Sequence, residues 1–282
     1  MNTGSRNNMS SEEASRLALK VAIRHRSQMP EHMHKYWRFR ESLFSRFNEG
    51  ILMDEESWYS VTPEALAYRI AVECKCKVAM DAFCGSGGNI IQFAMTCDHV
   101  IGLDIDPVKL EMAKHNAAIY GVKDKITFLC GDYQEFARDA DPKARAEGHI
   151  VPDEKWEGWH KKKIDVIFMS PPWGGVDYMT PSKIGSEAVP HPKYYNAYPL
   201  SALRPCGGFT LFDISMKISN KVVMFLPRNT DLDQISQVVS RDKSTKYTAH
   251  VEEMWMGTKL KALCVYFAKE QPNIEGSGES EE

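Results

Sequence analysis

The hydrophobic positions of this 282-residue chain follow two different patterns. Between residues 14 and 48 they recur at helical spacing, and aromatic residues are frequent in the second half, which predicts a helical segment. From residue 77 onward, short apolar runs alternate with segments of helical spacing, which predicts strands separated by helices. The expected strands are 78–83, 99–105, 125–130, 164–169 and 221–226, with two late strands at 247–254 and 260–268. Helices are expected at 88–96 and 107–120.

This alternation is typical of an α/β protein whose largely parallel sheet is covered by helices on both faces. The two late strands, which follow each other closely, indicate an antiparallel end and therefore a doubly wound mixed sheet. We divide the chain into a disordered N-terminus (1–13), a helical N-terminal extension or lid (14–76), a Rossmann-like core (77–270) and a disordered acidic tail (271–282). Within the core, the polar stretch 138–163 is expected to be a mobile surface insertion.

Composition and charge restrict the classes of function. The formal net charge is −3, whereas a protein that coats long nucleic acid usually has a broad basic surface. The balance is uneven, because residues 14–47 contain eight Lys or Arg against two Glu. A solvated helix face would also explain this local excess.

The seven cysteines are scattered and odd in number, and their spacing is poor for zinc, so we expect reduced thiols and no metal. Reduced thiols favour the cytosol or nucleus. The chain has no apolar stretch of membrane-spanning length and its first residues lack the apolar centre of a secretion signal.

A glycine-rich turn follows the first predicted strand, in Asp81-Ala-Phe83-Cys-Gly85-Ser-Gly87-Gly-Asn89. Glycines accept positive φ and let the backbone approach a ligand, while the following helix presents free N–H groups. We therefore expect these residues to bind a cofactor. A merely tight strand-to-helix turn is the structural alternative, and NAD, FAD and S-adenosylmethionine folds all use such a turn.

Two further carboxylates follow the next two strands. Asp104 ends the second strand and can accept hydrogen bonds from the hydroxyls of an adenosine ribose, while Asp106 is expected to cap the helix that begins at Pro107. Asp132 follows the third strand and can accept a hydrogen bond from an adenine amino group, although a helix cap is again the alternative. The spacing of these motifs resembles class I methyltransferases more than dehydrogenases, whose third glycine is missing here.

The fourth strand ends in Ser170-Pro171-Pro172-Trp173, which resembles the [D/N/S]-P-P-aromatic loop of methyltransferases acting on base amino groups. An exocyclic amine is a poor nucleophile because its lone pair is delocalised into the ring. Acceptors aimed at its N–H bonds, here the Ser170 hydroxyl and the Pro171 carbonyl, localise the lone pair and stabilise positive charge developing on nitrogen. Trp173 offers a flat face on which a base can stack. A buried Pro-Pro-Trp plug is the structural alternative.

Six stretches together resemble the trimethylguanosine synthases, a family that hypermethylates RNA caps, over residues 35–267. They are KYWRFRESLFSRFNEGI (35–51), WYSVTPE (58–64), DAFCGSGGN (81–89), DIDPVKLEMAKHNAAIYG (104–121), SPPWGGVDY (170–178) and FLPRN (225–229). The resemblance implies successive transfer of two methyl groups from S-adenosyl-L-methionine to N2 of a 7-methylguanosine cap on small nuclear and nucleolar RNAs. The cap becomes 2,2,7-trimethylguanosine, and S-adenosyl-L-homocysteine is released.

The resemblance also implies site residues outside these loops. Lys35, Tyr178, Arg228 and Lys259 are expected near the cap triphosphate, and Phe44 is expected to pack on the cap or cofactor. A surface or core role is the alternative for each. The cationic 7-methylguanine should be attracted to the indole of the catalytic loop beyond ordinary stacking, by about 0.5–2 kcal/mol.

Three consecutive residues of the N-terminal extension, Thr62, Pro63 and Glu64, look like cofactor contacts from a lid, and a surface or core role is again the alternative. In the insertion, Trp156, Trp159 and the lysines 161–163 could touch RNA, but a solvated loop is the preferred interpretation. The resemblance further implies a monomer in the nucleus, with nucleolus and Cajal bodies, and in the cytoplasm. Its implied partners are capped small RNA and ribonucleoprotein proteins, without a membrane.

Three other functions fit part of the sequence. A methyltransferase acting on an internal base of rRNA or DNA shares the Ser-Pro-Pro-Trp chemistry, but such an enzyme favours a basic domain that is missing here. A cap-binding module without activity would not need the intact Gly85, Gly87, Asp104 and Ser170. A nicotinamide dehydrogenase is excluded if labelled S-adenosylmethionine donates its methyl group.

Overall fold

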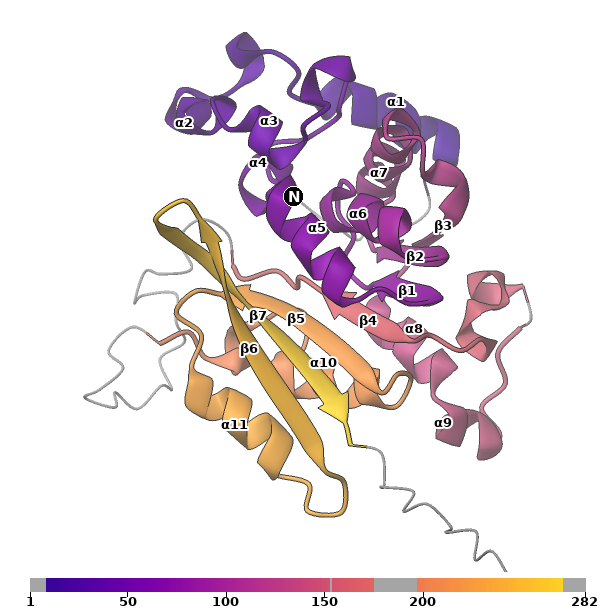
Figure 1. Ribbon diagram of the computed structural model, residues 1–282. Helices are drawn as coiled ribbons and strands as arrows, with labels where there is room; N and C mark the ends of the chain where they lie inside the picture. Colours follow the sequence, from indigo (N-terminus) through magenta and orange to yellow (C-terminus); the bar gives the residue numbers. More distant parts are fainter. Residues whose placement is uncertain (1–8, 153, 175–196, 271–282) are drawn as a thin grey trace, which may run out of the picture.

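A mixed sheet of seven strands in the order β3-β2-β1-β4-β5-β7-β6 lies at the centre of the computed structural model, which describes residues 9–152, 154–174 and 197–270 (Figure 1). The strands are β1 (Val78–Asp81), β2 (His99–Asp104), β3 (Ile126–Cys130), β4 (Val166–Met169), β5 (Lys221–Pro227), β6 (Tyr247–Met256) and β7 (Lys259–Lys269). Strands β1 to β5 pair in parallel, while β7 is antiparallel to both β5 and β6. The predicted doubly wound mixed sheet is therefore present.

Helices cover both faces of the sheet. The longer ones are α1 (Ser11–Val21), α5 (Glu64–Glu73), α6 (Gly88–Thr96), α7 (Pro107–Ile119), α8 (Tyr133–Ala140), α10 (Gly208–Met216) and α11 (Leu232–Ser240). The short α-helices are α2 (His34–Trp37), α3 (Arg40–Leu43), α4 (Ser57–Ser60) and α9 (Pro142–Ala146). The 3-10 helices are η2 (Arg26–Gln28), η3 (Glu31–Met33), η4 (Phe47–Glu49), η5 (Lys123–Lys125), η6 (Lys155–Lys161) and η8 (Leu200–Ala202).

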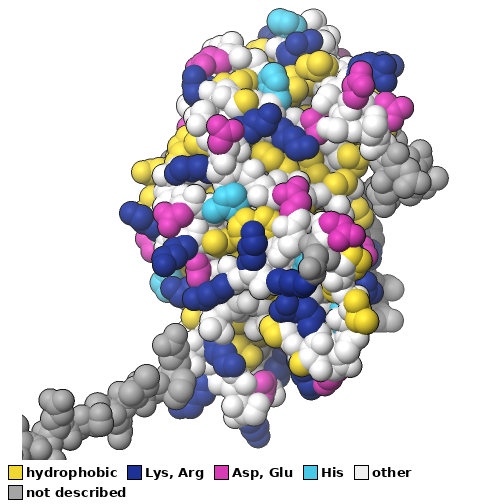
Figure 2. Space-filling view, turned by 90° about the vertical axis from the view of Figure 1, so that its right-hand side faces the viewer, with side chains coloured by type: hydrophobic (Ala, Val, Ile, Leu, Met, Phe, Trp, Pro, Cys, Tyr) yellow, Lys and Arg dark blue, Asp and Glu magenta, His cyan; other side chains and the backbone are white. Residues whose placement is uncertain are grey.

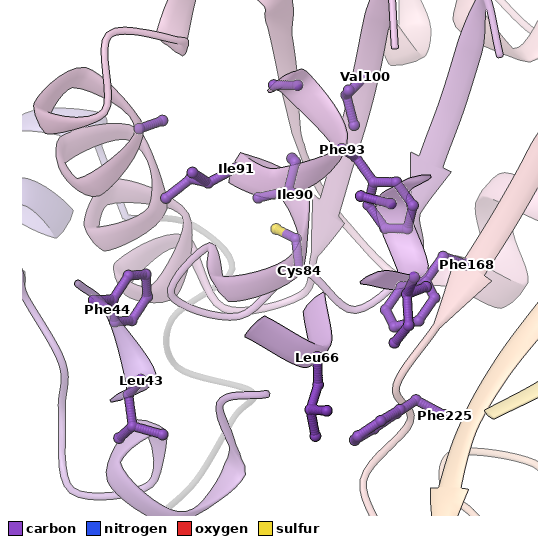
Figure 3. Close-up of a cluster of buried hydrophobic side chains, with 14 of the residues drawn as sticks. Leu43, Phe44, Leu66, Cys84, Ile90, Ile91, Phe93, Val100, Phe168 and Phe225 are labelled. Atoms are coloured by element: carbon purple, nitrogen blue, oxygen red, sulfur yellow. The ribbon is translucent and has the colours of Figure 1, made fainter. Parts of the chain in front are cut away.

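The side chains alternate along each strand and so build two separate cores. On β1, Ala79 faces the core formed with α5, α6, α7 and the N-terminal extension, whereas Met80 faces the core formed with α8, α10 and α11. Figure 3 shows part of the first core, in which Phe93 of α6 lies close to Phe168 of β4. Because β1, β2, β4 and β5 are buried on both sides, their sequences are almost continuously apolar.

The N-terminal extension contains one regular helix and several short turns. Helix α1 begins at Ser11, where Ser10 and Glu13 form a capping box. Residues 11–13 are therefore helical, although the sequence predicts that they are disordered. After Val21 the expected helical segment breaks into short α and 3-10 turns. Packing of aromatic rings explains the break, because Trp37 stacks on Trp58 with ring centroids 5.4 Å apart and Phe47 packs edge-on against Trp58.

Two buried polar side chains of α7 fasten the extension to the core. Asn116, which is fully buried, accepts a hydrogen bond from the Leu52 N–H at 2.8 Å and donates to the Leu52 carbonyl at 2.9 Å. Lys109 donates to Asp54 Oδ1 at 2.7 Å and to Ser57 Oγ at 3.2 Å. Burial alone would lower the pKa of Lys109, but the neighbouring carboxylates of Asp54 and Glu56 outweigh it and raise that pKa.

Within the segment 138–163, the two tryptophans pack on the protein instead of lying in a solvated loop, whereas the lysines 161–163 are exposed. Trp156 is only 8% exposed and lies edge-on against Phe136 in the second core. Its indole N–H donates to Asp139 Oδ2 at 2.8 Å. Gly131 leaves room for this ring, because a Cβ there would come within 2.5 Å of it. Trp159 stacks on His99, with centroids 4.8 Å apart, so the indole has a protein partner.

Candidate active site

The strand order reverses between β1 and β4, and in open α/β sheets ligands bind beyond the carboxyl ends of the strands at such a point. Asp81 ends β1 and pairs in register with Phe168 of β4. The Ala82 N–H donates to the Phe168 carbonyl at 3.0 Å, so the pairing continues one residue further. Ser170 follows Phe168 by two residues. The structure therefore brings the glycine-rich turn and the Ser-Pro-Pro-Trp loop to adjacent strand ends.

Asp81 is fully buried at this point of the sheet. Its Oδ1 accepts a hydrogen bond from the Phe83 N–H at 3.2 Å, but Oδ2 has no hydrogen-bond partner among the described residues. Burial raises the pKa of Asp81 to about 8, because water cannot solvate its charge. A buried carboxylate oxygen without a partner is costly and is a place where a cationic or donating ligand group would fit.

The glycines of the turn serve different purposes. Gly85 and Gly87 have φ values of +52° and +101°, which favour glycine. A Cβ on Gly85 would meet nothing within 4 Å, whereas one on Gly87 would lie 3.2 Å from the Ala113 backbone of α7. Gly85 therefore borders open space that a ligand can use, while Gly87 allows close packing between α6 and α7. Phe83 is half-buried and packs against Tyr133, with centroids 5.7 Å apart.

Asp104 and Asp106 have different structural roles at the end of β2. Asp106 caps α7 by accepting a hydrogen bond from the Val108 N–H at 2.9 Å, as predicted. Asp104 Oδ2 accepts from the Gly85 N–H and Oδ1 from the Asp106 N–H, both at 2.9 Å. Burial raises the pKa of Asp104 although these two donors oppose the shift. The carboxylate thus fixes the glycine-rich turn, and its contact with a ribose remains a prediction.

Asp132 has the cap role that was its alternative. Its Oδ1 accepts a hydrogen bond from the Gln134 N–H at 2.7 Å, at the start of α8. Such a cap does not use the second carboxylate oxygen. The adenine contact of Asp132 remains a prediction.

The end of the extension closes on the glycine-rich turn. Thr62 is 2% exposed, and its Oγ1 accepts a hydrogen bond from Asn89 Nδ2 at 3.1 Å. A Cβ on Gly88 would come within 2.9 Å of Val61, so the extension touches the first turn of α6. Asn89 Oδ1 is buried and has no partner among the described residues. The predicted lid residue Thr62 and turn residue Asn89 therefore lie side by side.

The other two lid residues begin α5. Pro63 is the N-cap residue of this helix and Glu64 is its first residue. The Glu64 carboxylate accepts hydrogen bonds from the Ser45 N–H at 2.6 Å and from the Tyr120 hydroxyl at 2.5 Å. These bonds hold the extension to α7, which is the structural alternative for Glu64.

Trp173 is half-buried and held in one orientation. Its indole N–H donates to the Phe225 carbonyl of β5 at 3.3 Å, and the two rings stack with centroids 5.9 Å apart. The Tyr198 hydroxyl donates to the Trp173 carbonyl at 3.0 Å. Phe225 and Tyr198 were not predicted, because their sequence surroundings mark them only as apolar residues. In the same loop Pro171 is buried.

The residues expected at the cap triphosphate lie at the surface. Lys35 and Lys259 are exposed, and Arg228 is exposed with a 3.5 Å hydrogen bond from Nη1 to the Leu260 carbonyl. Tyr178 lies outside the described residues. Phe44 is 1% exposed and belongs to the first core, where Figure 3 shows it near Leu43, so the core alternative explains its burial.

The described residues show two further absences. Among residues 9–152, 154–174 and 197–270, no group of three or more His, Cys, Asp or Glu is arranged to hold a metal ion. Within the same ranges, no helix has the length and apolarity needed to cross a membrane. On the face shown in Figure 2, basic side chains are interspersed with acidic and apolar ones.

Comparison with known proteins agrees with this arrangement. The family model described as RNA cap guanine-N2 methyltransferase matches residues 76–270. The trimethylguanosine synthase of Schizosaccharomyces pombe is 37% identical over 244 residues, which cover 85% of this chain and 87% of that protein. The trimethylguanosine synthase of Saccharomyces cerevisiae is 34% identical over 216 residues, which cover 74% of this chain and 59% of that protein.

A solved structure supports the fold. A protein from Porphyromonas gingivalis W83, proposed to be a methyltransferase, superposes with a TM-score of 0.55 at 13% identity, covering 94% of this chain and 56% of that one. With the strand order, this confirms the predicted class I methyltransferase fold.

Proposed function

Because this chain belongs to the RNA cap guanine-N2 methyltransferase family, we propose that it transfers two methyl groups in succession to N2 of a 7-methylguanosine cap. The product would be the 2,2,7-trimethylguanosine cap of small nuclear and nucleolar RNAs. The observation that carries this proposal is the meeting of Asp81, the glycine-rich turn and the Ser170–Trp173 loop at the switch point of the sheet. Cofactor and nucleobase would thus share one crevice.

The family implies S-adenosylmethionine as cofactor, and the residues at the turn fit it. The buried Oδ2 of Asp81 is suited to the ammonium group of the methionine part, since it has no partner among the described residues. Asp104 would accept the ribose hydroxyls, Asp132 the adenine amino group, and Phe83 would pack on the adenine. Gly85 leaves space for the backbone to approach the cofactor. When bound, the cofactor supplies an electrophilic methyl group on sulfur.

The lid would complete the cofactor site. Thr62 and Asn89 form a hydrogen-bonded pair beside the glycine-rich turn, and Pro63 and Glu64 set the direction of α5 from there. Their packing would exclude water from the side of the turn that faces the extension. Water exclusion strengthens the polar contacts made inside the crevice.

Trp173 would select the cap. The bond to the Phe225 carbonyl and the stacking on the Phe225 ring fix the indole plane, so less entropy is lost when a base stacks. A cationic purine gains about 0.5–2 kcal/mol from an electron-rich ring. Lys35, Tyr178, Arg228 and Lys259 would bind the triphosphate, with Phe44 supporting the site from the core.

Ser170 and Pro171 would prepare the amine. The Ser170 hydroxyl and the Pro171 carbonyl would accept hydrogen bonds donated by the N–H groups of N2 and so direct the nitrogen lone pair toward the methyl carbon. A new N–C bond forms as the S–C bond breaks, the electron pair stays on sulfur, and N2 then loses a proton to water. No general base or metal is needed in this proposal. Repetition on the same nitrogen gives the dimethylated base.

Mass spectrometry of 7-methyl-GTP incubated with S-adenosylmethionine tests the proposal. We expect products heavier by one and then by two CH2 units, with GTP as a much poorer substrate. Methylation of an uncapped RNA that excess 7-methyl-GTP does not inhibit would instead support an internal base as the target. We further propose that the protein is a monomer with ribonucleoprotein proteins as partners. It would act in the nucleus, including nucleoli and Cajal bodies, and in the cytoplasm.

A further inference from the structure

Phe39, an aromatic residue of the N-terminal extension, is exposed and accompanied by two cations. It is 43% exposed, although a phenylalanine is usually buried. The guanidinium carbon of Arg38 lies 4.8 Å from the centroid of its ring, and Lys261 Nζ lies 6.0 Å from it. Arg38 and Lys261 are exposed and make no ion pair with another described residue. We name these three residues the Phe39 surface.

The Phe39 surface is built from two distant parts of the chain. Arg38 and Phe39 lie between α2 and α3, whereas Lys261 belongs to the first residues of β7. Lys259 precedes Lys261 by two residues and is also exposed. Figure 1 shows the β6–β7 hairpin reaching toward the extension. Folding therefore brings Arg38 and Lys261 to the same aromatic ring.

A short series of contacts connects the Phe39 surface to the proposed cap site. Trp173 stacks on Phe225 of β5. Two residues along β5, Pro227 pairs with Ala262 of β7, which adjoins Lys261. Arg228 follows Pro227 and bonds to the Leu260 carbonyl. The Phe39 surface therefore lies beside Arg228 and Lys259, the residues expected at the cap triphosphate.

We propose that the Phe39 surface binds the first nucleotides of the RNA that follow the cap, as a single strand. This inference rests on the proposed function, because the cap site fixes where the RNA begins. Exposed aromatic rings and guanidinium planes stack unpaired bases, and cations around them hold the backbone phosphates. The surface would raise the affinity for capped RNA above that for the cap nucleotide alone.

The charge of the chain favours RNA at this place. The protein is acidic overall, with a net charge of −3, while residues 14–47 carry the local excess of basic side chains to which Arg38 belongs. A basic segment continuous with a triphosphate site is where a polyanion leaving that site would be held. The same charges would also attract an acidic protein, which competition between an acidic peptide and an uncapped oligonucleotide distinguishes from RNA.

Steady-state kinetics with two substrates tests the inference. The first is 7-methyl-GTP, and the second is an oligoribonucleotide of about ten residues that carries the same cap. For the unchanged protein we expect a KM for the oligonucleotide about fivefold or more below that for 7-methyl-GTP, the smallest gain from one stacked base. Phe39→Ala should remove most of this difference and leave kcat and the KM for 7-methyl-GTP unchanged.

Conservative and remote variants separate RNA binding from a structural role. Phe39→Trp should keep the advantage of the oligonucleotide, whereas Phe39→Leu, which is apolar but not flat, should lose it. Lys261→Ala should lower the salt dependence of oligonucleotide binding by about 0.7 in the slope of log K against log salt. Lys123→Ala, at the amino end of β3, removes the same charge away from the surface and should change neither quantity.

The outcomes are distinguishable. If the unchanged protein does not methylate 7-methyl-GTP, the proposed function fails. If it methylates 7-methyl-GTP, but Phe39→Ala and Lys261→Ala leave the KM values for both substrates and the salt dependence unchanged, the Phe39 surface does not bind RNA. Competition by an acidic peptide that is stronger than competition by an uncapped oligonucleotide would also overturn the inference in favour of a protein partner.

Discussion

Replacing Asp81 by Asn should make the ligand-free protein more stable and its cofactor binding weaker. Asp81 is fully buried, one of its oxygens has no partner among the described residues, and its pKa is raised to about 8. An aspartate in the unfolded chain has a pKa near 3.9. At any pH between these two pKa values, Asp81 is therefore protonated in the folded state and ionised in the unfolded state.

The sign and size of the effect follow from this difference. Stability decreases as the pH rises from about 4 to about 8, because ionising Asp81 costs more in the folded state. At pH 7.5 the window spans roughly 3.6 pH units, or roughly 5 kcal/mol at 1.36 kcal/mol per unit. Asn removes this penalty but buries an amide donor, which costs about 1–3 kcal/mol when it lacks a partner. The net gain should be about 2–4 kcal/mol, or about 3–7 °C in Tm.

Chemical denaturation at about pH 5 and pH 7.5 measures this gain, which should be small at the lower pH and largest at the higher. Asp165→Asn is the matched control. The pKa of Asp165 is lowered, because a bond from the Val78 N–H and the charge of Lys163 outweigh its burial. Neutralising Asp165 should therefore destabilise the protein at pH 7.5.

Cofactor binding should change in the opposite direction from stability. Calorimetry with S-adenosylhomocysteine should show Asp81→Asn binding at least tenfold more weakly, the lower limit for a charge-assisted hydrogen bond. In the unchanged protein, affinity should rise between about pH 6 and pH 8 with release of a proton, because the ammonium group favours ionised Asp81. A variant that is destabilised like Asp165→Asn and binds with unchanged affinity would refute the assignment of Asp81.

Three other substitutions test different parts of the site. Trp173→Ala should weaken binding of 7-methyl-GDP about fivefold or more in a fluorescence titration, whereas Trp173→Phe keeps a stacking ring and should keep part of the affinity. Wild-type affinity in the alanine variant would contradict the stacking role. Ser170→Ala should lower kcat and leave the KM for 7-methyl-GTP nearly unchanged, and a purely KM effect in steady-state assays would show that Ser170 only binds. Asp139→Asn weakens the bonds from Trp156, His149 and Lys155 and should speed amide hydrogen exchange in residues 149–160 while methylation of 7-methyl-GTP continues; unchanged exchange would mean that the ion pairs do not hold this segment.

The strands and the switch point could be predicted from the sequence because strands buried on both faces leave continuous apolar runs. The run 221–226 became β5, Lys221–Pro227, and the cap at Asp106 followed from an acid before Pro107. The break of the extension into turns could not be predicted. The break depends on the stacking of Trp37 on Trp58, two residues that are far apart in sequence. The apolar residues near Trp37 keep helical spacing, so the local pattern predicted a helix.

The burial of Trp156 was missed for the same reason. Its neighbours in sequence are charged, and they indicate a surface loop. The ring is held by Asp139 from α8 and fits over Gly131, so three separated positions decide its place. At the candidate site, the motif predicted Asp81, but no sequence pattern could show that one of its oxygens lacks a partner.

The extension and the glycine-rich turn form one structural unit, which limits how the site can open. Asn116 donates to the Leu52 carbonyl in the extension and to the Ser86 carbonyl in the turn, at 2.9 and 2.8 Å. Withdrawing the extension would break both bonds between Asn116 and Leu52 and leave only the bond to Ser86, and an unsatisfied buried polar group costs about 1–3 kcal/mol. Thr62 would lose its bond from Asn89 at the same time. A ligand that binds the glycine-rich turn in this conformation therefore also favours packing of the extension against the core. The reason is that the turn and the extension are held by the same hydrogen bonds.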